Sequence, residues 1–512
     1  MTNSNSDSHQ PPLGETRTTE HQLGDLSYTA IAGWQRLFAK EKPTAELFHV
    51  AYLATGSEGK ADPTRPVTFV FNGGPGAASA YLHMGSLGPK RVQFGPEGRL
   101  PKSPVQVVDN TESWLPFTDL VFVDPVGTGF SRLLPAADND PEAGRKSPPK
   151  PPAKNTAAKN NGSSSAQDSD QDNLYWEVER DLESLGEFIQ TWLSKHHRWL
   201  SPIFIAGESY GGYRVARLAR RLQQSYGIGL SGAIMVSPAL EFSLLYGSDY
   251  NLSYWISLVP SFAAVAHQHR LAGSGVSPEA HRTAAEIFAR QRLLPSLALG
   301  DSLPLEERQA VWAELASLTG IPLNLVTRQE ARLDIGLFAR ELLRSQRQIV
   351  GLYDASLVAW DPFPDRLHFE GDDPSLDGID RLFTGAINSH LRQTLGVETD
   401  LRYYLLNMDV FKNWRFDPQA EFRQGFIGSV DDLRSGMALN PHMKVNISHG
   451  LFDLVTTYFS SQHLIDLMRL PVELRQNLQL DTYPGGHMFY SWDPSRQAWT
   501  ERMRAFYKSC QS

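Results

Sequence analysis

The stretch FIAGESYGGY, residues 204–213, places Ser209 between an apolar run and a helical pattern. The residues at 203–206 are apolar and suit a strand that is buried in a parallel sheet. After the serine, apolar residues recur at helical spacing as far as Gly227, namely Val215, Leu218, Ala219 and Leu222. Strand, tight turn and helix in this order are typical of a nucleophile elbow, which exposes a serine hydroxyl at the carboxyl end of a sheet. The alternative is a glycine-rich turn with an incidental serine.

Two further segments have the pattern of buried strands. PVTFVFNGGPGAAS (66–79) and TDLVFVDPVGTGFS (118–131) each put a continuous apolar run directly before a glycine-rich loop. By contrast, 26–38 and 45–54 alternate in polarity and predict an antiparallel pair at a sheet edge. The sequence therefore predicts an α/β protein with a mostly parallel central sheet.

The chain divides into four kinds of segment. Its 512 residues allow one large core and an added lobe, since single cores stop growing near about 250 to 300 residues. We expect a disordered tail over 1–24 and a core formed by 25–240 and 431–512. Residues 134–172 are rich in Pro, Ser, Asn, Lys and Asp and predict a solvated low-complexity insertion. Helical spacing without a strand pattern over 241–430 predicts a helical cap over the carboxyl face of the sheet.

Composition and charge argue against several classes of protein. The formal net charge is −9 and no basic stripe is present, so we expect no nucleic-acid partner. No apolar run approaches the roughly 20 residues that cross a bilayer, so we expect no membrane association. The amino terminus has no secretory pattern, and the single cysteine, Cys510, cannot form a disulfide within the chain. We therefore expect a cytoplasmic protein, although disulfide-free proteins are also exported.

A serine at an elbow needs an acid and a histidine, which follow it in that order along an α/β-hydrolase chain. Asp453 follows the expected late strand KVNISHGLF at 444–452, and His487 follows 478–486 on an open glycine-rich loop. Other acids and histidines are worse placed along the chain: Asp466, Asp481, His442, His449 and His463. Taken singly, Asp453 also suits a helix cap, and His487 also suits an incidental loop residue.

An oxyanion hole needs two backbone N–H groups. One should belong to Tyr210, which follows the candidate nucleophile. The other should come from a loop after an early strand, and Gly74 in the NGGPG segment, 72–76, is the natural donor because glycine allows the backbone to approach a substrate. A plain turn is the alternative for this loop.

Together these segments resemble the serine carboxypeptidase family. The similar segments are FNGGPGAAS, DLVFVDPVGTGFS, FIAGESYGG, HGLFD and YPGGHM, in the family's order, across roughly residues 26–500. The resemblance implies an α/β-hydrolase fold with a mostly parallel central sheet, helices on both faces and an inserted helical cap. It also implies that the protein needs no cofactor or metal, and that it releases carboxyl-terminal residues from peptides with a free C-terminus.

The resemblance also implies roles for individual residues. They are the nucleophile Ser209, the acid Asp453, the base His487 and the oxyanion donors Gly74 and Tyr210. The substrate's terminal carboxylate would be held by Asn72, Gly73 and Glu208. Glu208 can donate a hydrogen bond to a carboxylate only when it is protonated.

Three positions depart from the family pattern. Val70 stands where the family usually has tryptophan, and Ala77 stands where it has a disulfide cysteine, which suggests a disulfide-free, bacterial-type member. Ser86 stands where a second glutamate normally pairs with the one equivalent to Glu208. Because a neighbouring carboxyl raises a carboxyl pKa, we expect a weaker rise of the Glu208 pKa here.

Three functions remain open at this point. The first is a serine carboxypeptidase that forms an acyl-enzyme on Ser209. The second is an esterase or acyltransferase with the same triad, because an acyl-enzyme can be discharged by water or by another alcohol. The third is a catalytically silent binding protein on a hydrolase scaffold, which would have no physical need to retain all three triad residues.

Overall fold

The computed structural model describes residues 15–39, 42–56, 61–134, 175–366, 373–416 and 427–511. The predicted insertion at 134–172 lies outside the described residues, apart from its first residue. In the parts of the chain that the structure describes, no helix is long and apolar enough to span a bilayer.

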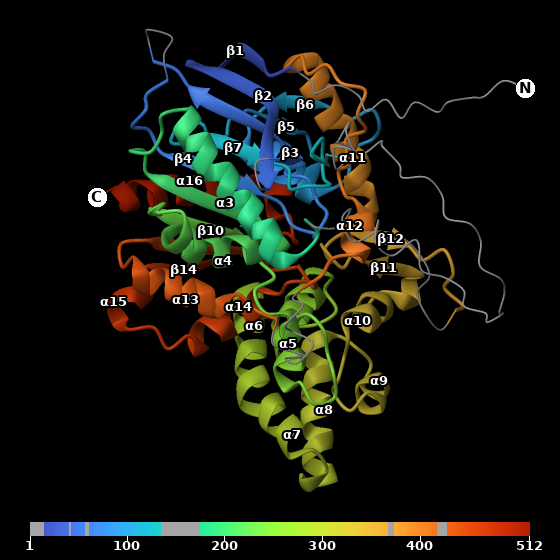
Figure 1. The fold of residues 1–512 in the computed structure, drawn as a ribbon. Helices are drawn as coiled ribbons and strands as arrows, with labels where there is room; N and C mark the ends of the chain where they lie inside the picture. The colour runs from blue at the N-terminus through green and yellow to red at the C-terminus, as the bar shows by residue number, and fades with distance from the viewer. Residues whose placement is uncertain are drawn as a thin grey trace, which may run out of the picture.

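A ten-stranded sheet forms the centre of the described structure (Figure 1). Its order is β1 (Arg17–Leu23), β2 (Leu26–Ala39), β3 (Lys42–Ala54), β7 (Asp119–Val123), β4 (Val67–Phe71), β9 (Ile203–Glu208), β10 (Gly232–Val236), β13 (Lys444–Gly450) and β14 (Leu478–Tyr483), with β8 (Arg132–Leu133) paired to β3. From β7 to β14 all neighbours are parallel, whereas β1, β2 and β3 run antiparallel at one edge. The prediction of a mostly parallel α/β fold is confirmed.

Helices cover both faces of this sheet. Those around it are α1 (Ala80–Leu82), α3 (Val178–Lys195), α4 (Tyr210–Ser225), α13 (Val430–Leu439), α14 (Tyr458–Leu467), α15 (Val472–Arg475) and α16 (Asp493–Gln511). Ile205 and Met235 point to the face covered by α3, α4 and α13. Phe204 and Ile234 point to the opposite face, where α16 packs. Because the central strands are buried on both faces, their sequences are continuous apolar runs.

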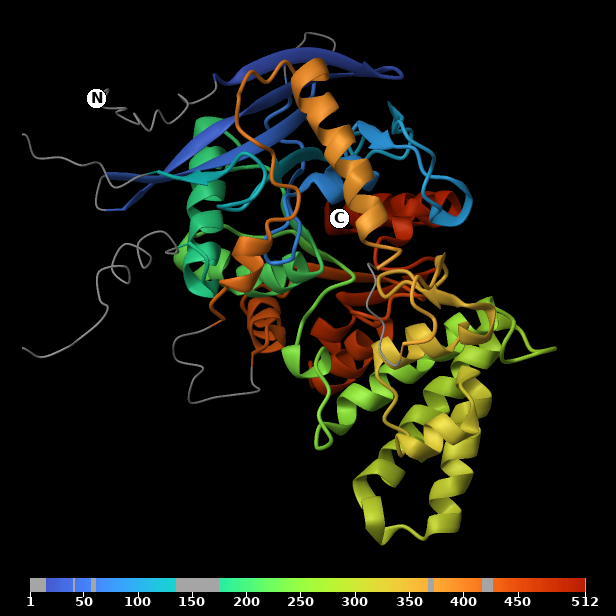
Figure 2. The ribbon, with the colours of Figure 1, turned by 90° about the vertical axis from the view of Figure 1, so that its right-hand side faces the viewer.

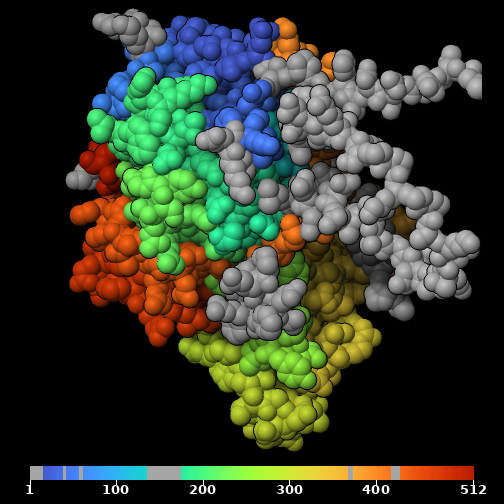
Figure 3. All heavy atoms as spheres, in the orientation of Figure 1, coloured from blue at the N-terminus to red at the C-terminus, as the bar shows by residue number. Residues whose placement is uncertain are grey.

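A second group of helices builds a lobe with its own apolar core. It contains α5 (Leu252–Gln268), α6 (Pro278–Phe288), α7 (Leu294–Leu299), α8 (Leu305–Thr319), α9 (Leu323–Arg328) and α10 (Ile335–Glu341). Phe262 of α5 stacks on Phe338 of α10 at a ring distance of 4.0 Å. The lobe projects from the sheet domain as a separate mass (Figure 3).

The structure differs from the prediction of one cap over 241–430. α11 (Asp377–Ser389) does not join the lobe, and two perpendicular views place it beside the amino-terminal strands (Figures 1 and 2). Its apolar side chains, including Phe383 and Ile387, belong to the same cluster as the sheet residues Phe122 and Phe204. The helical spacing was visible in the sequence, but the face on which each helix packs is a tertiary property.

The remaining elements are short. Two hairpins are formed by β5 (Lys90–Val92) with β6 (Val107–Asp109), and by β11 (Gln348–Val350) with β12 (Val358–Trp360). The second hairpin lies inside the region that was expected to be helical. Single turns of helix are η1 (His83–Leu87), η2 (Pro96–Gly98), η3 (Phe242–Leu244), η4 (Ala289–Leu293), η5 (Gly300–Ser302), η6 (Arg344–Gln346), α12 (Met408–Lys412), η7 (His390–Thr394) and η9 (Phe489–Ser491).

The predicted disordered tail over 1–24 is wrong from Arg17 onward. Residues 17–23 form β1, which pairs with β2 in continuous antiparallel register from Arg17 opposite Ala32 to Leu23 opposite Leu26. Its side chains are mostly polar and none is fully buried, so no apolar signal marks the strand. The backbone pairing with β2 is what orders this segment.

We predict that Phe383→Ala in α11 lowers the free energy of unfolding by about 3 to 5 kcal/mol, because it leaves a cavity in the core. The Phe383 ring is fully buried and lies 5.1 Å from the ring of Tyr81 and 6.1 Å from that of Phe94. The measurement is chemical denaturation of purified protein. Thr384→Ala, at the next, exposed position of the same helix, is the control and should change stability by less than about 0.5 kcal/mol.

Candidate functional site

Ser209 occupies a sharp turn between β9 and α4. Its backbone has φ 60° and ψ −123°, a strained conformation that costs on the order of 1 to 3 kcal/mol for a residue with a side chain. The Ser209 N–H donates to the carbonyl of Val236 at 2.9 Å. The Ser209 carbonyl accepts from the N–H groups of Gly212 at 2.9 Å and Ala239 at 3.1 Å. These bonds hold the strained turn, which lies at the carboxyl end of β9.

His487 and Asp453 form a buried hydrogen-bonded pair. His487 Nδ1 lies 2.7 Å from Asp453 Oδ2, and the two residues are 6% and 0% exposed. The other carboxylate oxygen accepts from the N–H groups of Val455 at 2.9 Å and Thr456 at 3.0 Å. Burial lowers the pKa of His487, but the charge and hydrogen bond of Asp453 outweigh burial, so the pKa is raised above its ordinary value.

The loop after β4 lies against the start of α4. Gly74 has φ +98°, a conformation that residues with a side chain rarely adopt. A Cβ atom placed on the neighbouring Gly73 would lie only 2.5 Å from the backbone nitrogen of Tyr210. Tyr210 is the first residue of α4, and the first N–H groups of a helix have no acceptor within the helix. The two backbone segments proposed from the sequence as oxyanion donors are therefore adjacent.

An arginine beneath this loop joins it to α3. Arg214 Nη1 donates to the carbonyl of Asn72 at 2.7 Å, and its Nε lies 2.8 Å from Asp181 Oδ2. Both side chains of the ion pair are at most 3% exposed. The guanidinium group also lies over the ring of Tyr210, 5.0 Å from its centroid. Burial raises the pKa of Asp181, and the positive charge of Arg214 opposes this shift.

Glu208, directly before the candidate nucleophile, is buried with two hydrogen-bond donors. Asn72 Nδ2 lies 2.5 Å from its Oε2, and the Tyr490 hydroxyl lies 2.9 Å from Oε1 and 3.1 Å from Oε2. Burial raises the pKa of Glu208 to about 7, although His487 and both hydrogen bonds oppose the shift. Burial is the largest cause of this shift and the charge of Asp453 adds to it, so the raised pKa of Glu208 does not require a second carboxyl group at Ser86.

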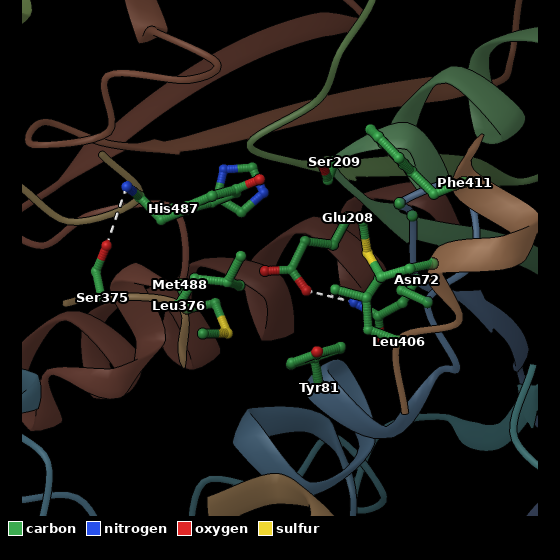
Figure 4. Close-up of a pocket in the computed structure, with 15 residues that line it drawn as sticks. Asn72, Tyr81, Glu208, Ser209, Ser375, Leu376, Leu406, Phe411, His487 and Met488 are labelled. Atoms are coloured by element: carbon green, nitrogen blue, oxygen red, sulfur yellow. Dashed lines mark hydrogen bonds between the residues drawn. The ribbon is translucent and has the colours of Figure 1, made fainter. Parts of the chain in front are cut away.

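The candidate residues meet in one cavity of about 170 Å³ (Figure 4). In that view the imidazole of His487 lies beside Ser209, and the Glu208 carboxyl group lies below them. The wall is mainly apolar, and the residues that line it are Asn72, Gly73, Gly74, Ala77, Tyr81, Glu208, Ser209, Tyr353, Ser375, Leu376, Leu406, Met408, Phe411, His487 and Met488. Among the described residues, no group of three or more His, Cys, Asp or Glu side chains is placed to hold a metal ion.

The segment 352–355, which returns from the helical lobe, binds the loop after β13. The Leu454 N–H donates to the Leu352 carbonyl at 3.0 Å, and the Ala355 N–H donates to the Phe452 carbonyl at 2.9 Å. These two bonds lie on either side of the candidate acid. The segment therefore fixes the backbone from which that carboxylate projects.

The same segment binds the loop after β14. The His487 N–H donates to the Tyr353 carbonyl at 2.5 Å, and the Gly486 N–H donates to Asp354 Oδ2 at 3.1 Å. The ring of Tyr353 also meets the His487 ring edge to face at 5.2 Å. Burial raises the pKa of Asp354 to about 6, while hydrogen bonds from Ser356 and Gly486 oppose the shift.

Sequence reasoning missed four residues around this site. Tyr490, Asp354 and Thr456 gave no sequence signal, because their roles depend on contacts with distant segments. Thr456 donates its hydroxyl proton, and its Oγ1 lies 2.7 Å from Asp453 Oδ2. Arg214 did give a signal, since it is a charged residue beside the apolar positions of the helix that follows the elbow.

Part of the chain is similar to a known protein family. The model of the family described as serine carboxypeptidase matches residues 27–241. Two Arabidopsis thaliana relatives are serine carboxypeptidase-like 13, 29% identical over 181 residues, and serine carboxypeptidase-like 5, 25% identical over 245 residues. The alignments cover 34% and 46% of this chain and 33% and 46% of the respective relatives. The chain thus spans less than half the length of these curated relatives.

Among solved structures, the chain is similar to Kex1Δp, described as a prohormone-processing carboxypeptidase from Saccharomyces cerevisiae. The TM-score is 0.55 at 16% identity, and the match covers 94% of this chain and 91% of the other. This similarity establishes a shared α/β-hydrolase fold.

We predict that Asp354→Ala lowers kcat by about 10- to 100-fold on every substrate, because a loosened histidine loop misplaces the base. The measurement is steady-state kinetics on a small ester together with the melting temperature. Asp354→Asn is the matched control, since its amide oxygen can still accept from the Gly486 N–H. Equal kcat values for Asp354→Ala and wild type would show that the hydrogen bond from the Gly486 N–H to Asp354 does not position His487.

Proposed function

We propose that the protein is a serine-type carboxypeptidase, because the model of the serine carboxypeptidase family matches residues 27–241. It hydrolyses the carboxyl-terminal bond of a peptide through an acyl-enzyme on Ser209. The observation that carries the proposal is the place of Glu208, whose buried carboxyl group lines the same cavity as Ser209 and His487.

This arrangement suits a substrate with a free terminal carboxylate. Below neutral pH Glu208 is protonated, because burial raises its pKa to about 7, and it can then donate a hydrogen bond. Asn72 and the backbone of Gly73 line the cavity beside it. No lysine or arginine is among the described residues that line the cavity, so neutral donors would bind the carboxylate.

The geometry supports the following reaction. The Ser209 hydroxyl oxygen bonds to the scissile carbonyl carbon while His487 Nε2 takes the hydroxyl proton. Asp453 holds the proton on His487 Nδ1 and stabilises the imidazolium. The N–H groups of Gly74 and Tyr210 bind the negative charge on the carbonyl oxygen.

The tetrahedral intermediate then collapses. The carbon–nitrogen bond breaks, His487 gives its proton to the departing amine, and the terminal amino acid leaves as an ester forms on Ser209. Water attacks this ester with His487 again as the base, which releases the shortened peptide and restores the serine hydroxyl.

An esterase or acyltransferase is the second candidate. It would use the same Ser209 chemistry, and the mainly apolar wall of the cavity favours it. The two candidates differ in whether Glu208 binds a terminal carboxylate. The third candidate, a silent binding protein, differs from both because its serine would not be activated.

We predict that a fluorophosphonate probe labels Ser209 and that peptide mapping locates the adduct there. Ser209→Ala should abolish labelling and lower kcat by a factor on the order of a million, while the fold survives. Ser113→Ala is a control, because that buried hydroxyl donates to the Leu87 carbonyl at 2.8 Å and does not line the cavity. Absence of labelling in folded wild-type protein would favour the silent scaffold.

We predict that kcat/KM for a peptide with a free carboxyl terminus depends on pH in a bell shape. Activity falls at low pH because His487 becomes protonated, with a pKa above its ordinary value of 6.5. Activity falls again as pH rises through about 7, because Glu208 becomes an anion that faces the substrate's carboxylate.

The matched substrate is the same peptide with its carboxyl terminus amidated. Its profile should retain the low-pH limb and lose the high-pH limb, since no carboxylate is bound. If the two profiles coincide, Glu208 does not bind the terminal carboxylate and the esterase or acyltransferase becomes the better assignment.

A further inference from the structure

We propose that Tyr490 is a positioning residue for substrate recognition, which orients the Glu208 carboxyl group so that its proton faces the substrate's terminal carboxylate. This inference rests on the proposed function and adds a residue that neither the sequence pattern nor the family comparison identified.

Tyr490 is held rigidly beside Glu208. It lies in the single turn η9, shortly after His487, and its side chain is fully buried. Its ring stacks on Trp499 at 6.0 Å with an interplanar angle of 20°. Within the described parts of the chain, both hydrogen bonds of its hydroxyl go to Glu208, at 2.9 Å and 3.1 Å.

The hydrogen-bond roles around Glu208 can be assigned from the neighbouring contacts. The Asn72 Oδ1 accepts from the Leu82 N–H at 3.0 Å, so the Asn72 NH₂ group must face Glu208. The Tyr490 hydroxyl has no other acceptor among the described residues, so it too donates to Glu208. Glu208 thus receives two donors, and its own acidic proton remains for the cavity that it lines.

Burial, more than the neighbouring charges, favours a protonated Glu208 at acid pH. The ionisable side chains that act on Glu208 are His487, Tyr490 and Asp453, and Glu208 in turn acts on Tyr81. His487 lowers the Glu208 pKa and Asp453 raises it, but burial is the larger effect. Burial also raises the pKa of Tyr490 well above its ordinary value, so its hydroxyl stays a donor throughout the working range.

Gly85 makes room for the tyrosine ring. A Cβ atom at Gly85 would lie 2.6 Å from Tyr490 Cε2, so only glycine permits this approach. The adjacent Ser86 is fully buried, and its hydroxyl has no hydrogen-bond partner in the described structure. Ser86 is the position at which a second acid was expected from the family resemblance. In this chain the tyrosine supplies the second contact to Glu208.

The test is Tyr490→Phe, which removes one hydroxyl and keeps the stacked ring. At the pH of maximal activity, KM for the free-carboxyl peptide should rise about tenfold, as expected for losing one hydrogen bond, while kcat changes less than about threefold. KM for the amidated peptide should not change. The high-pH limb of the free-carboxyl profile should move to higher pH, because the lost donor stabilised the Glu208 carboxylate.

A matched control separates this role from packing. Tyr507→Phe also removes a buried tyrosine hydroxyl, one that lies 2.6 Å from Thr68 Oγ1 and away from the cavity. It should leave both KM values and both pH profiles unchanged. If Tyr490→Phe shifts KM equally for the two peptides, or shifts neither KM nor the pH limb, Tyr490 does not orient Glu208.

A binding measurement distinguishes this inference from the proposed function. Ser209→Ala and Ser209→Ala/Tyr490→Phe are titrated calorimetrically with the free-carboxyl and amidated peptides. If wild type hydrolyses esters but no peptide, the carboxypeptidase proposal fails. Weaker binding of only the free-carboxyl peptide to the double variant would still support the role of Tyr490, and equal binding would overturn it.

Discussion

The strained turn at Ser209 is the constraint on which the rest of the site depends. A residue with a Cβ atom adopts φ 60° only when its surroundings enforce it, and here the last residue of β10 and the segment after it supply two of the three bonds that do so. β9 must therefore lie between β4 and β10, as the sheet order places it. This order also puts the loop after β4 beside the first turn of α4. The strained conformation of Ser209 therefore requires a strand order that also brings both candidate oxyanion donors together.

Around this turn, ionisable groups are buried with specific partners. Arg214 and Asp181 form a pair beneath the Asn72 carbonyl, and Asp453 is surrounded by donors that include His487. A buried charge without such a partner is costly. Removing one member of a pair therefore destabilises the protein, because the other charge stays buried without compensation. Glu208 is different, because both of its partners are neutral donors. Its burial consequently favours the protonated acid, which is the form that can bind an anion.

The helical lobe contributes to the site through a short backbone segment. Residues 352–355 bind the loop after β13 and the loop after β14, and so hold the acid and the histidine in fixed relation. The lobe has its own apolar core, yet that core includes Phe452 and Leu454 from the sheet domain. The stability of the lobe and the geometry of the candidate site are therefore coupled.

The sequence alone determined the features whose signals are local. Apolar runs before glycine-rich loops predicted β4, β7 and β9, and the order of Ser209, Asp453 and His487 followed from the places of those residues after strands. Only the tertiary structure decided that α11 packs on the sheet and that Tyr490 binds Glu208, a residue 282 positions away. Such contacts depend on which surfaces meet after folding. A local pattern of polarity indicates that a residue is buried, but it does not indicate which distant residue it will contact.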